Sequence, residues 1–429
     1  VIMIKFTRPL MLVLIGICIA AVPILAYAQP SSDIKQIYPK MYPAGGLEWK
    51  GETTQNTNWN KICEDKKGRI WFSGGDHWGT DRQGGRYEDR YERPWGYGNT
   101  TVCYYDPKTD KAYVAYELNR VSGIFSNTET PGHGKIHADI VCDGDGNIWT
   151  GGYLGSSYNH EWTQQYYPKS YVGGAVIKYN PETKDIDYYG IPNPGGGLVS
   201  LKFDAKRNVV HGVTVERQRY YRMNIDTMEL KRYDIARYSG REITADHEGN
   251  VWFFNEFNSF TKFDPDTETY TDFDIKMPGQ LRASVVSKKG IIYGITAEGF
   301  LWSWDTKTNK YEEYGHVVGT PDTRVYTPNI CIDDQWDRLY LMAGGHGSTL
   351  AGMPILTIFD LKEKKFYWPG AVDVDGCYGS VVGKDHAVYF SCYFYAQKNR
   401  KRLKDKDGNE YRLPGLVRYD PPKSLEDIK

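Results

Sequence analysis

Residues able to carry acid–base chemistry stand in Gly-rich turns and at the starts of short apolar runs. His77 lies in Gly74-Gly75-Asp76-His77-Trp78-Gly79, and His137 opens the run His137-Ala138-Asp139-Ile140. Tyr220 follows an Arg-rich stretch. A His or Tyr at such a place can remove a proton from carbon or return one to a leaving oxygen. We therefore expect His77, His137 and Tyr220 to be the catalytic residues.

The same segments are rich in Arg, His and Tyr side chains that could hold a substrate. Guanidinium groups match carboxylates with two parallel hydrogen bonds, and aromatic rings stack on sugar rings. The residues expected to bind substrate are Arg217, Arg219, Arg241, Arg282, His160, Tyr153 and Tyr378. His133 and His346 are weaker candidates in similar turns. This inventory favours an acidic sugar over a neutral one.

The residue types favour β-elimination at a uronate. In that reaction a base removes the C5 proton after the neighbouring carboxylate has been neutralised, and an acid protonates the leaving oxygen at C4. Hydrolysis uses two carboxylic acids about 5–10 Å apart, and no obvious pair stands in these segments. A hydrolase and a glycan-binding protein without catalysis remain the alternatives.

Metal-ligand patterns are absent from the candidate loops. No His-x-His or Glu-x-x-His spacing occurs in them to support a metal site. We expect no required cofactor and no metal residues, with a divalent cation such as calcium as the alternative.

A repeated phrase indicates the elements that position these residues. Asp-x-x-Gly-x-x-Trp, between two apolar runs, occurs at 65–71, 143–149 and 246–252. Degraded copies follow at 204–210, 287–293, 333–340 and 383–389. Each is typical of a tight hairpin turn between short strands. Seven copies without long helical segments predict an all-β fold, a seven-bladed β-propeller.

A propeller brings two kinds of loop to the same end. These are the loops that lead into each innermost strand and those that join the second strand of a blade to the third. The candidate residues were selected from those loops. His211, His247 and His386 fall in or beside the repeat turns at the opposite end and are discarded.

The first 28 residues have the pattern of a secretory signal peptide. Lys5 and Arg8 precede the apolar stretch Leu10–Leu25, and Ala26-Tyr27-Ala28 resembles a cleavage site. The apolar stretch is short for a membrane span and contains Pro23. We expect a periplasmic or secreted protein with no membrane insertion after cleavage. Its N-terminal extension would cover 29–50 and its propeller 51–429.

The net charge indicates the kind of partner, and the positions of the cysteines indicate the state of their thiols. With 53 basic and 54 acidic residues the net charge is −1, which argues against nucleic acid or an anionic membrane. An acidic plant-type polysaccharide or oligosaccharide is the expected partner, and the chain is expected to be a monomer. The six cysteines after the signal peptide lie mostly among Ile and Val, as free core thiols do.

The repeated Gly-Asn-x-Trp blades, Gly-Gly-Asp-His-Trp-Gly and His-Ala-Asp-Ile together resemble two families of exported seven-bladed propellers. These are polysaccharide lyase family 42 and glycoside hydrolase family 145. The resemblance implies cleavage of L-rhamnose-α-1,4-D-glucuronate linkages in arabinogalactan-type glycans.

One position departs from the hydrolase branch. That branch has its catalytic His early in the first blade, where this sequence carries Gln55. The resemblance therefore favours the lyase branch. The repeat is also similar to that of streptogramin lyases, which open a cyclic ester by elimination with His and a divalent metal.

Overall fold

Strands make up almost all of the regular structure. The computed structural model describes residues 35–37, 40–44, 58–75, 100–124, 132–154, 171–215, 219–233, 241–255, 257, 259–276, 278–318, 325–344, 353–395, 397–398, 401–402, 412–426 and 428. Over these residues the chain forms seven sheets of four or five strands, one short helix and a small hairpin. The predicted seven-bladed β-propeller is confirmed.

The first four blades follow one another along the chain. Blade 1 contains β3 (Cys63–Glu64), β4 (Ile70–Gly74), β5 (Thr101–Asp106) and β6 (Lys111–Glu117), followed by helix α2 (Leu118–Ser122). Blade 2 contains β7 (His133–Ile136), β8 (Val141–Cys142), β9 (Ile148–Leu154), β10 (Val176–Tyr179) and β11 (Ile186–Tyr188). Blade 3 contains β12 (Gly197–Asp204), β13 (Val209–Val215), β14 (Arg219–Asn224) and β15 (Leu230–Tyr233). Blade 4 contains β16 (Thr244–Ala245), β17 (Val251–Phe254), β18 (Ser259–Asp264) and β19 (Thr269–Lys276).

The last three blades include strands from both ends of the described chain. Blade 5 contains β20 (Leu281–Val286), β21 (Ile291–Thr296), β22 (Phe300–Asp305) and β23 (Lys310–His316). Blade 6 contains β24 (Cys331–Asp333), β25 (Arg338–Ala343), β26 (Ile355–Asp360), β27 (Lys365–Val372) and β1 (Gln36–Ile37). Blade 7 contains β28 (Gly376–Val382), β29 (Val388–Tyr395), β32 (Arg412–Tyr419) and β2 (Lys40–Pro43). The hairpin pairs β30 (Gln397–Lys398) with β31 (Lys401–Arg402).

The innermost strands form a closed ring. Strands β3, β8, β12, β16, β20, β24 and β28 contact one another in that order, and β28 contacts β3 again. Residues at the starts of these strands therefore face a common channel, which is the geometry that a shared binding site needs.

The repeated turns are held by a buried Asp–Trp hydrogen bond. The indole Nε1 atoms of Trp71, Trp149 and Trp252 each donate to the Asp six residues earlier at 2.8 Å. The other carboxylate oxygen accepts backbone N–H groups of the turn, as Asp143 does from Asp145 and Asn147 at 2.9 Å. The turn glycine has positive φ, for example 93° at Gly146, where a side chain would be strained. The Asp-x-x-Gly-x-x-Trp spacing thus corresponds to a turn whose Asp side chain fixes the buried Trp of the same repeat.

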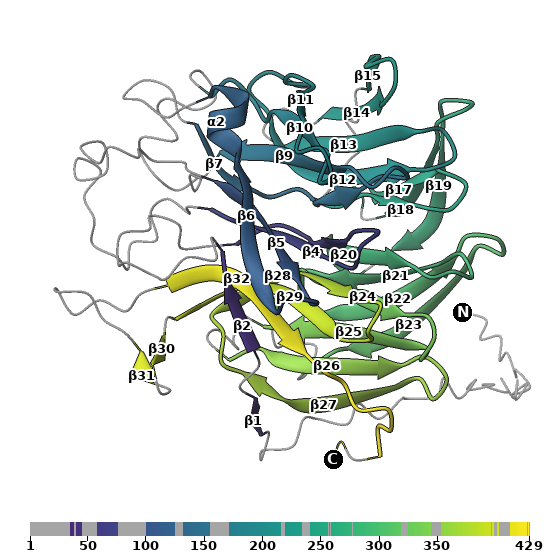
Figure 1. The fold of residues 1–429 in the computed structure, drawn as a ribbon. Coiled ribbons are helices and arrows are strands. Elements are labelled where there is room, and N and C mark those ends of the chain that lie inside the picture. The colour runs from purple at the N-terminus through teal and green to yellow at the C-terminus, as the bar shows by residue number, and fades with distance from the viewer. Residues whose placement is uncertain are drawn as a thin grey trace, which may run out of the picture.

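The propeller begins earlier in the chain than the boundary expected from the sequence. Strand β2 pairs antiparallel with β32, so that Tyr42 lies opposite Leu416. Strand β1 pairs parallel with β27 (Figure 1). Residues placed in an N-terminal extension (29–50) therefore supply the outer strand of blade 7, and the propeller begins before residue 51. The pairing joins segments almost at opposite ends of the sequence, so no local pattern reveals it.

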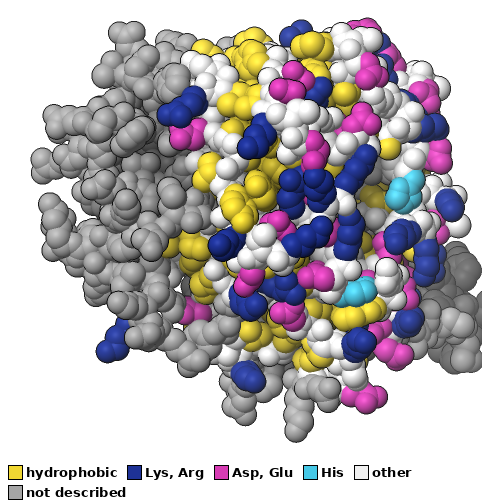
Figure 2. All heavy atoms as spheres, viewed as in Figure 1, with side chains coloured by type: hydrophobic (Ala, Val, Ile, Leu, Met, Phe, Trp, Pro, Cys, Tyr) yellow, Lys and Arg dark blue, Asp and Glu magenta, His cyan; other side chains and the backbone are white. Residues whose placement is uncertain are grey.

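The outer surface carries charges of both signs. In Figure 2 the basic side chains gather near the centre of the viewed face with acidic side chains among them. Several exposed ion pairs join neighbouring blades, such as Arg207 with Asp266 at 2.5 Å. No helix among the described residues is long and apolar enough to cross a membrane.

Candidate functional site at the channel mouth

Side chains from six blades meet at the end of the channel where the innermost strands begin. We call this set the channel-mouth cluster: Trp59, Lys135, His137, Tyr153, Arg241, Arg282, Tyr326, Tyr378 and Tyr393. Arg241 of blade 4 lies 3.3 Å from His137 of blade 2. Because these blades are not adjacent, the contact crosses the inside of the ring. The structure thus brings together His137, Arg241, Arg282, Tyr153 and Tyr378, five of the residues singled out from the sequence.

His137 is held as a neutral imidazole. Its Nε2 atom accepts a hydrogen bond from Nη1 of Arg241 at 3.3 Å. A guanidinium can only donate, so the ring proton is on Nδ1. That atom is buried without a hydrogen-bond partner among the described residues. Burial lowers the pKa of His137 well below its usual value, and the charges of Arg241, Lys135 and Arg282 lower it further. The ring is therefore uncharged at neutral pH.

Aromatic rings form the wall of the site. The ring of Trp59 lies 4.2 Å from that of Tyr378 and 6.0 Å from that of His137, measured between centroids. The ammonium group of Lys135 lies 4.4 Å from the Trp59 ring centroid and 5.1 Å from that of Tyr153. These contacts are cation–π interactions within the usual range. They hold the positive charge of Lys135 beside the faces of the aromatic side chains.

Two polar groups of the wall lack hydrogen-bond partners in the described part of the chain. The Tyr378 hydroxyl is buried and unpaired, and burial raises its pKa well above the usual value. Arg282 donates from Nη2 to the Tyr326 hydroxyl at 2.5 Å, whereas its Nε atom is buried without a partner. A buried donor without a partner is costly. A ligand that accepted from these atoms would remove that cost.

Below the cluster, four charged side chains cross the channel. Lys202 contacts Asp139 at 2.6 Å and Glu242 at 3.1 Å. Lys61 of blade 1 forms an ion pair with Glu242 of blade 4. Asp139 also accepts from Ser200 at 3.0 Å. This network neutralises two carboxylates with two ammonium groups, and it ties together the segments that carry His137 and Arg241.

Tyr220 is the clearest correction to the expected site. It lies on β14, the third strand of blade 3, and is 2% exposed. Its hydroxyl lies 2.7 Å from Nδ1 of His211, and its ring packs against Tyr233 and Phe263. A third strand cannot reach the channel, since two strands of its own blade lie between. Tyr220 is a core residue.

The remaining sequence candidates lie elsewhere. Arg219 is half-buried at the start of β14, opposite Thr214, at the same end of the propeller as the cluster. His133 is buried and lies 3.1 Å from the Tyr171 hydroxyl, and burial lowers its pKa to about 3. His77, Arg217, His160 and His346 lie outside the described residues.

Sequence reasoning missed Trp59, Lys135 and Tyr326. Lys135 was detectable, since it alternates with His137 along the same segment. Trp59 and Tyr326 precede the repeat turns at Asp65 and Asp333 and so stand before the inner strands of blades 1 and 6. Both residues therefore occupy the same kind of loop as Arg241 and Arg282.

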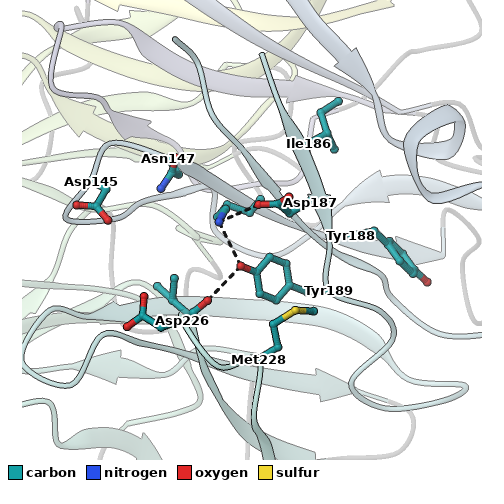
Figure 3. Close-up of a pocket in the computed structure, with 10 residues that line it drawn as sticks. Asp145, Asn147, Ile186, Asp187, Tyr188, Tyr189, Asp226 and Met228 are labelled. Atoms are coloured by element: carbon teal, nitrogen blue, oxygen red, sulfur yellow. Dashed lines mark hydrogen bonds and ion pairs between the residues drawn. The ribbon is translucent and has the colours of Figure 1, made fainter. Parts of the chain in front are cut away.

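A groove at the other end of the propeller offers no comparable chemistry. It has a volume of about 540 Å³ and lies between blades 2 and 3, lined by Asp145, Asp187, Tyr188 and Met228 among others (Figure 3). Its lysine, Lys178, is paired with Asp187 at 2.8 Å. The ammonium group of Lys178 is thus already occupied by Asp187 and the Tyr189 hydroxyl, so we place the candidate site at the channel mouth.

No metal centre is formed by the described residues. Within them, no group of three or more His, Cys, Asp or Glu side chains is arranged to hold a metal ion.

Comparison with known proteins supports the fold. A family described as two component regulator propeller matches residues 54–76, a short part of blade 1. A structure of streptogramin B lyase is 12% identical, with a TM-score of 0.53 over 89% of this chain and 98% of the other. A catalytically inactive virginiamycin B lyase from Staphylococcus aureus with quinupristin is 11% identical, with a TM-score of 0.53 over 88% of this chain and 99% of that one.

The extracellular domain of a putative hybrid two component system from B. thetaiotaomicron is 13% identical, with a TM-score of 0.55. The match covers 90% of this chain and 43% of that one. No curated protein matches the sequence. At these identities the structural likeness concerns the propeller fold alone, a fold that hosts many functions.

Replacing Arg241 with Met is expected to raise the pKa of His137. Loss of a nearby positive charge favours the protonated imidazolium, whereas burial remains and keeps the pKa below its usual value. A pH titration of the His137 ring signals by NMR measures the shift. Lys206→Met is the control, since Lys206 is paired with Glu248 on the exposed surface. Identical His137 titrations in the two variants would contradict the electrostatic role of Arg241.

Proposed function

We propose that the protein binds an acidic sugar at the channel-mouth cluster and cleaves its glycosidic bond by β-elimination. The substrate proposed from the sequence resemblance is a glycan ending in L-rhamnose-α-1,4-D-glucuronate. The observation that carries the proposal is the pairing of a neutral His137 with Arg241 at 3.3 Å, beside Arg282 and an aromatic wall. A base, charge neutralisation for a carboxylate and a surface for sugar rings are thereby combined.

Substrate binding would activate the base. A uronate carboxylate that accepts from Arg241 competes with Nε2 of His137 for the guanidinium N–H groups. Its negative charge also offsets the cations that lower the pKa of His137. The imidazole thus gains a free lone pair and becomes more basic when the substrate is in place. Without substrate, Arg241 keeps the same atom occupied.

The chemical step needs no added reagent. Nε2 of His137 takes the C5 proton, and the electrons of that bond form the C4=C5 double bond. The C4–O bond breaks, and the leaving oxygen takes a proton from an acid. The Tyr378 hydroxyl suits that role, because its raised pKa keeps it protonated and no described side chain accepts its hydrogen bond. The products are rhamnose and an unsaturated uronate.

A second candidate function is recognition of an acidic glycan without cleavage. It is favoured by the match to the two component regulator propeller family at residues 54–76. The same cations and aromatic rings would bind the ligand, while His137 would act only as a hydrogen-bond donor through Nδ1. An extracellular sensing role would follow.

The test is to incubate the purified protein with a rhamnose-capped glucuronate oligosaccharide. Free rhamnose is measured together with the ultraviolet absorbance of the unsaturated uronate. We expect both to rise at equal molar rates. Rhamnose without absorbance would replace elimination by hydrolysis. Calorimetric binding without either product would support the recognition function and overturn the lyase proposal.

A further inference from the structure

Two cysteines of blade 7 face each other across neighbouring strands. Cys377 on β28 lies directly opposite Cys392 on β29 in the antiparallel register. Residues at such positions have Cα atoms about 4.5–5.5 Å apart and side chains on the same face of the sheet. Disulfides bridge Cα separations of about 4.4–6.8 Å. The register of the pair is therefore one that a disulfide can span, and the irregularity of β28 begins only after Cys377.

The environment of the pair is dry and well packed. Cys377 is 1% exposed and Cys392 is 0% exposed, and both belong to one hydrophobic cluster with Cys331. Burial and the adjacent Cys392 thiol raise the pKa of Cys377 well above its usual value. Since the thiolate is the reactive form, thiols sealed in this way react slowly once the blade has folded. All six described cysteines are free thiols in the structure.

The two cysteines lie in the blade that closes the ring, next to residues of the channel mouth. Blade 7 closes the ring with β2. The residues that follow the two cysteines, Tyr378 and Tyr393, both belong to the aromatic cluster of the channel mouth. A bond between the cysteines would fix the two strands that carry these rings.

We propose that Cys377 and Cys392 form a structural cross-strand disulfide when the chain folds under oxidising conditions. The oxidant is a small-molecule or protein disulfide. One cysteine thiolate attacks it to give a mixed disulfide, and the second thiolate displaces the remaining thiol. One S–S bond forms in the protein, two thiols are released by the oxidant, and both cysteines lose their protons. The inference is independent of the proposed enzymatic activity.

The experiment compares unfolded chain refolded with oxidised glutathione and with a reductant. After blocking of free thiols in denaturant, peptide mapping by mass spectrometry identifies linked cysteines. We expect a Cys377–Cys392 link in the oxidised sample and blocked thiols at both positions in the reduced one. Cys103 is an internal control, because Phe72 and Val114 stand opposite it. It should remain a blockable thiol in both samples.

Thermal unfolding gives a second readout. The cross-link should raise the melting temperature of oxidised protein by about 5 °C over reduced protein. Cys392→Ala should abolish that difference. Free thiols at both positions after oxidative refolding, or a link from either cysteine to another partner, would overturn the proposal. Should the variant fail to fold, the peptide map of the wild-type chain still decides.

Discussion

His137→Ala should lower the rate of elimination by about 10²–10⁴-fold while the protein stays folded. The variant removes the group proposed to take the C5 proton but leaves Arg241, Arg282 and the aromatic wall to bind the sugar. The rate constant should therefore fall with little change in substrate affinity. Formation of the unsaturated product under saturating substrate, with calorimetric binding of glucuronate, separates the two effects.

The matched control is His247→Ala. His247 lies at the opposite end of the propeller, where Nε2 is 2.8 Å from the Ser287 carbonyl oxygen. This variant should keep near-normal activity. A rate close to wild type for His137→Ala would exclude it as the base. Loss of binding in place of catalysis would favour the recognition function.

Asp143→Ala should lower the free energy of unfolding by about 3–5 kcal/mol. The substitution leaves the indole N–H of Trp149 without its acceptor in a fully buried position. It also removes the acceptor for backbone N–H groups of the turn. Urea denaturation followed by tryptophan fluorescence measures the loss.

Asp145→Ala tests whether the effect is specific to the buried carboxylate. Asp145 lies in the same turn, and its side chain is exposed. The variant should stay within about 0.5 kcal/mol of wild type. Equal losses in both variants would show that the turn, and not the Asp143–Trp149 hydrogen bond, determines stability.

The fold could be predicted from the sequence because each repeated turn is stabilised by residues close to one another in the chain. Asp, Gly and Trp at fixed spacing are joined by bonds within seven residues, so the blades could be counted without any knowledge of tertiary contacts. The clean copies at Asp65, Asp143 and Asp246 all have the same hydrogen bond to Trp. Degraded copies keep only part of this arrangement. Ser287 accepts the N–H of Ile291 at 3.1 Å, as Asp143 accepts that of Asn147, but Tyr293 stands where the clean copies have Trp.

The site was predictable where a residue lies just before an innermost strand, as Arg241 does, or near the end of a second strand, as Tyr153 does. The repeat alone was enough to place Arg241, Arg282 and Tyr378. Each stands before a repeated turn, and that position determines which end of the channel the residue faces. Tyr220 lies away from the site because it belongs to the third strand of its blade. Both faces of that strand, β14, pack against other blades. The contact of His137 with Arg241 spans blades 2 and 4, and such distances across the ring are not encoded in any local pattern.

The pairing of β2 with β32 has a consequence for biosynthesis. A ribosome makes β2 early and β32 only after about 370 further residues. During that interval β2 has an unsatisfied edge, and the intervening blades can assemble one after another without it. Joining of the two ends is then the last event of folding and a slow one, because it closes a very long loop. Chaperone capture of nascent chains should consequently be greatest just before β32 emerges.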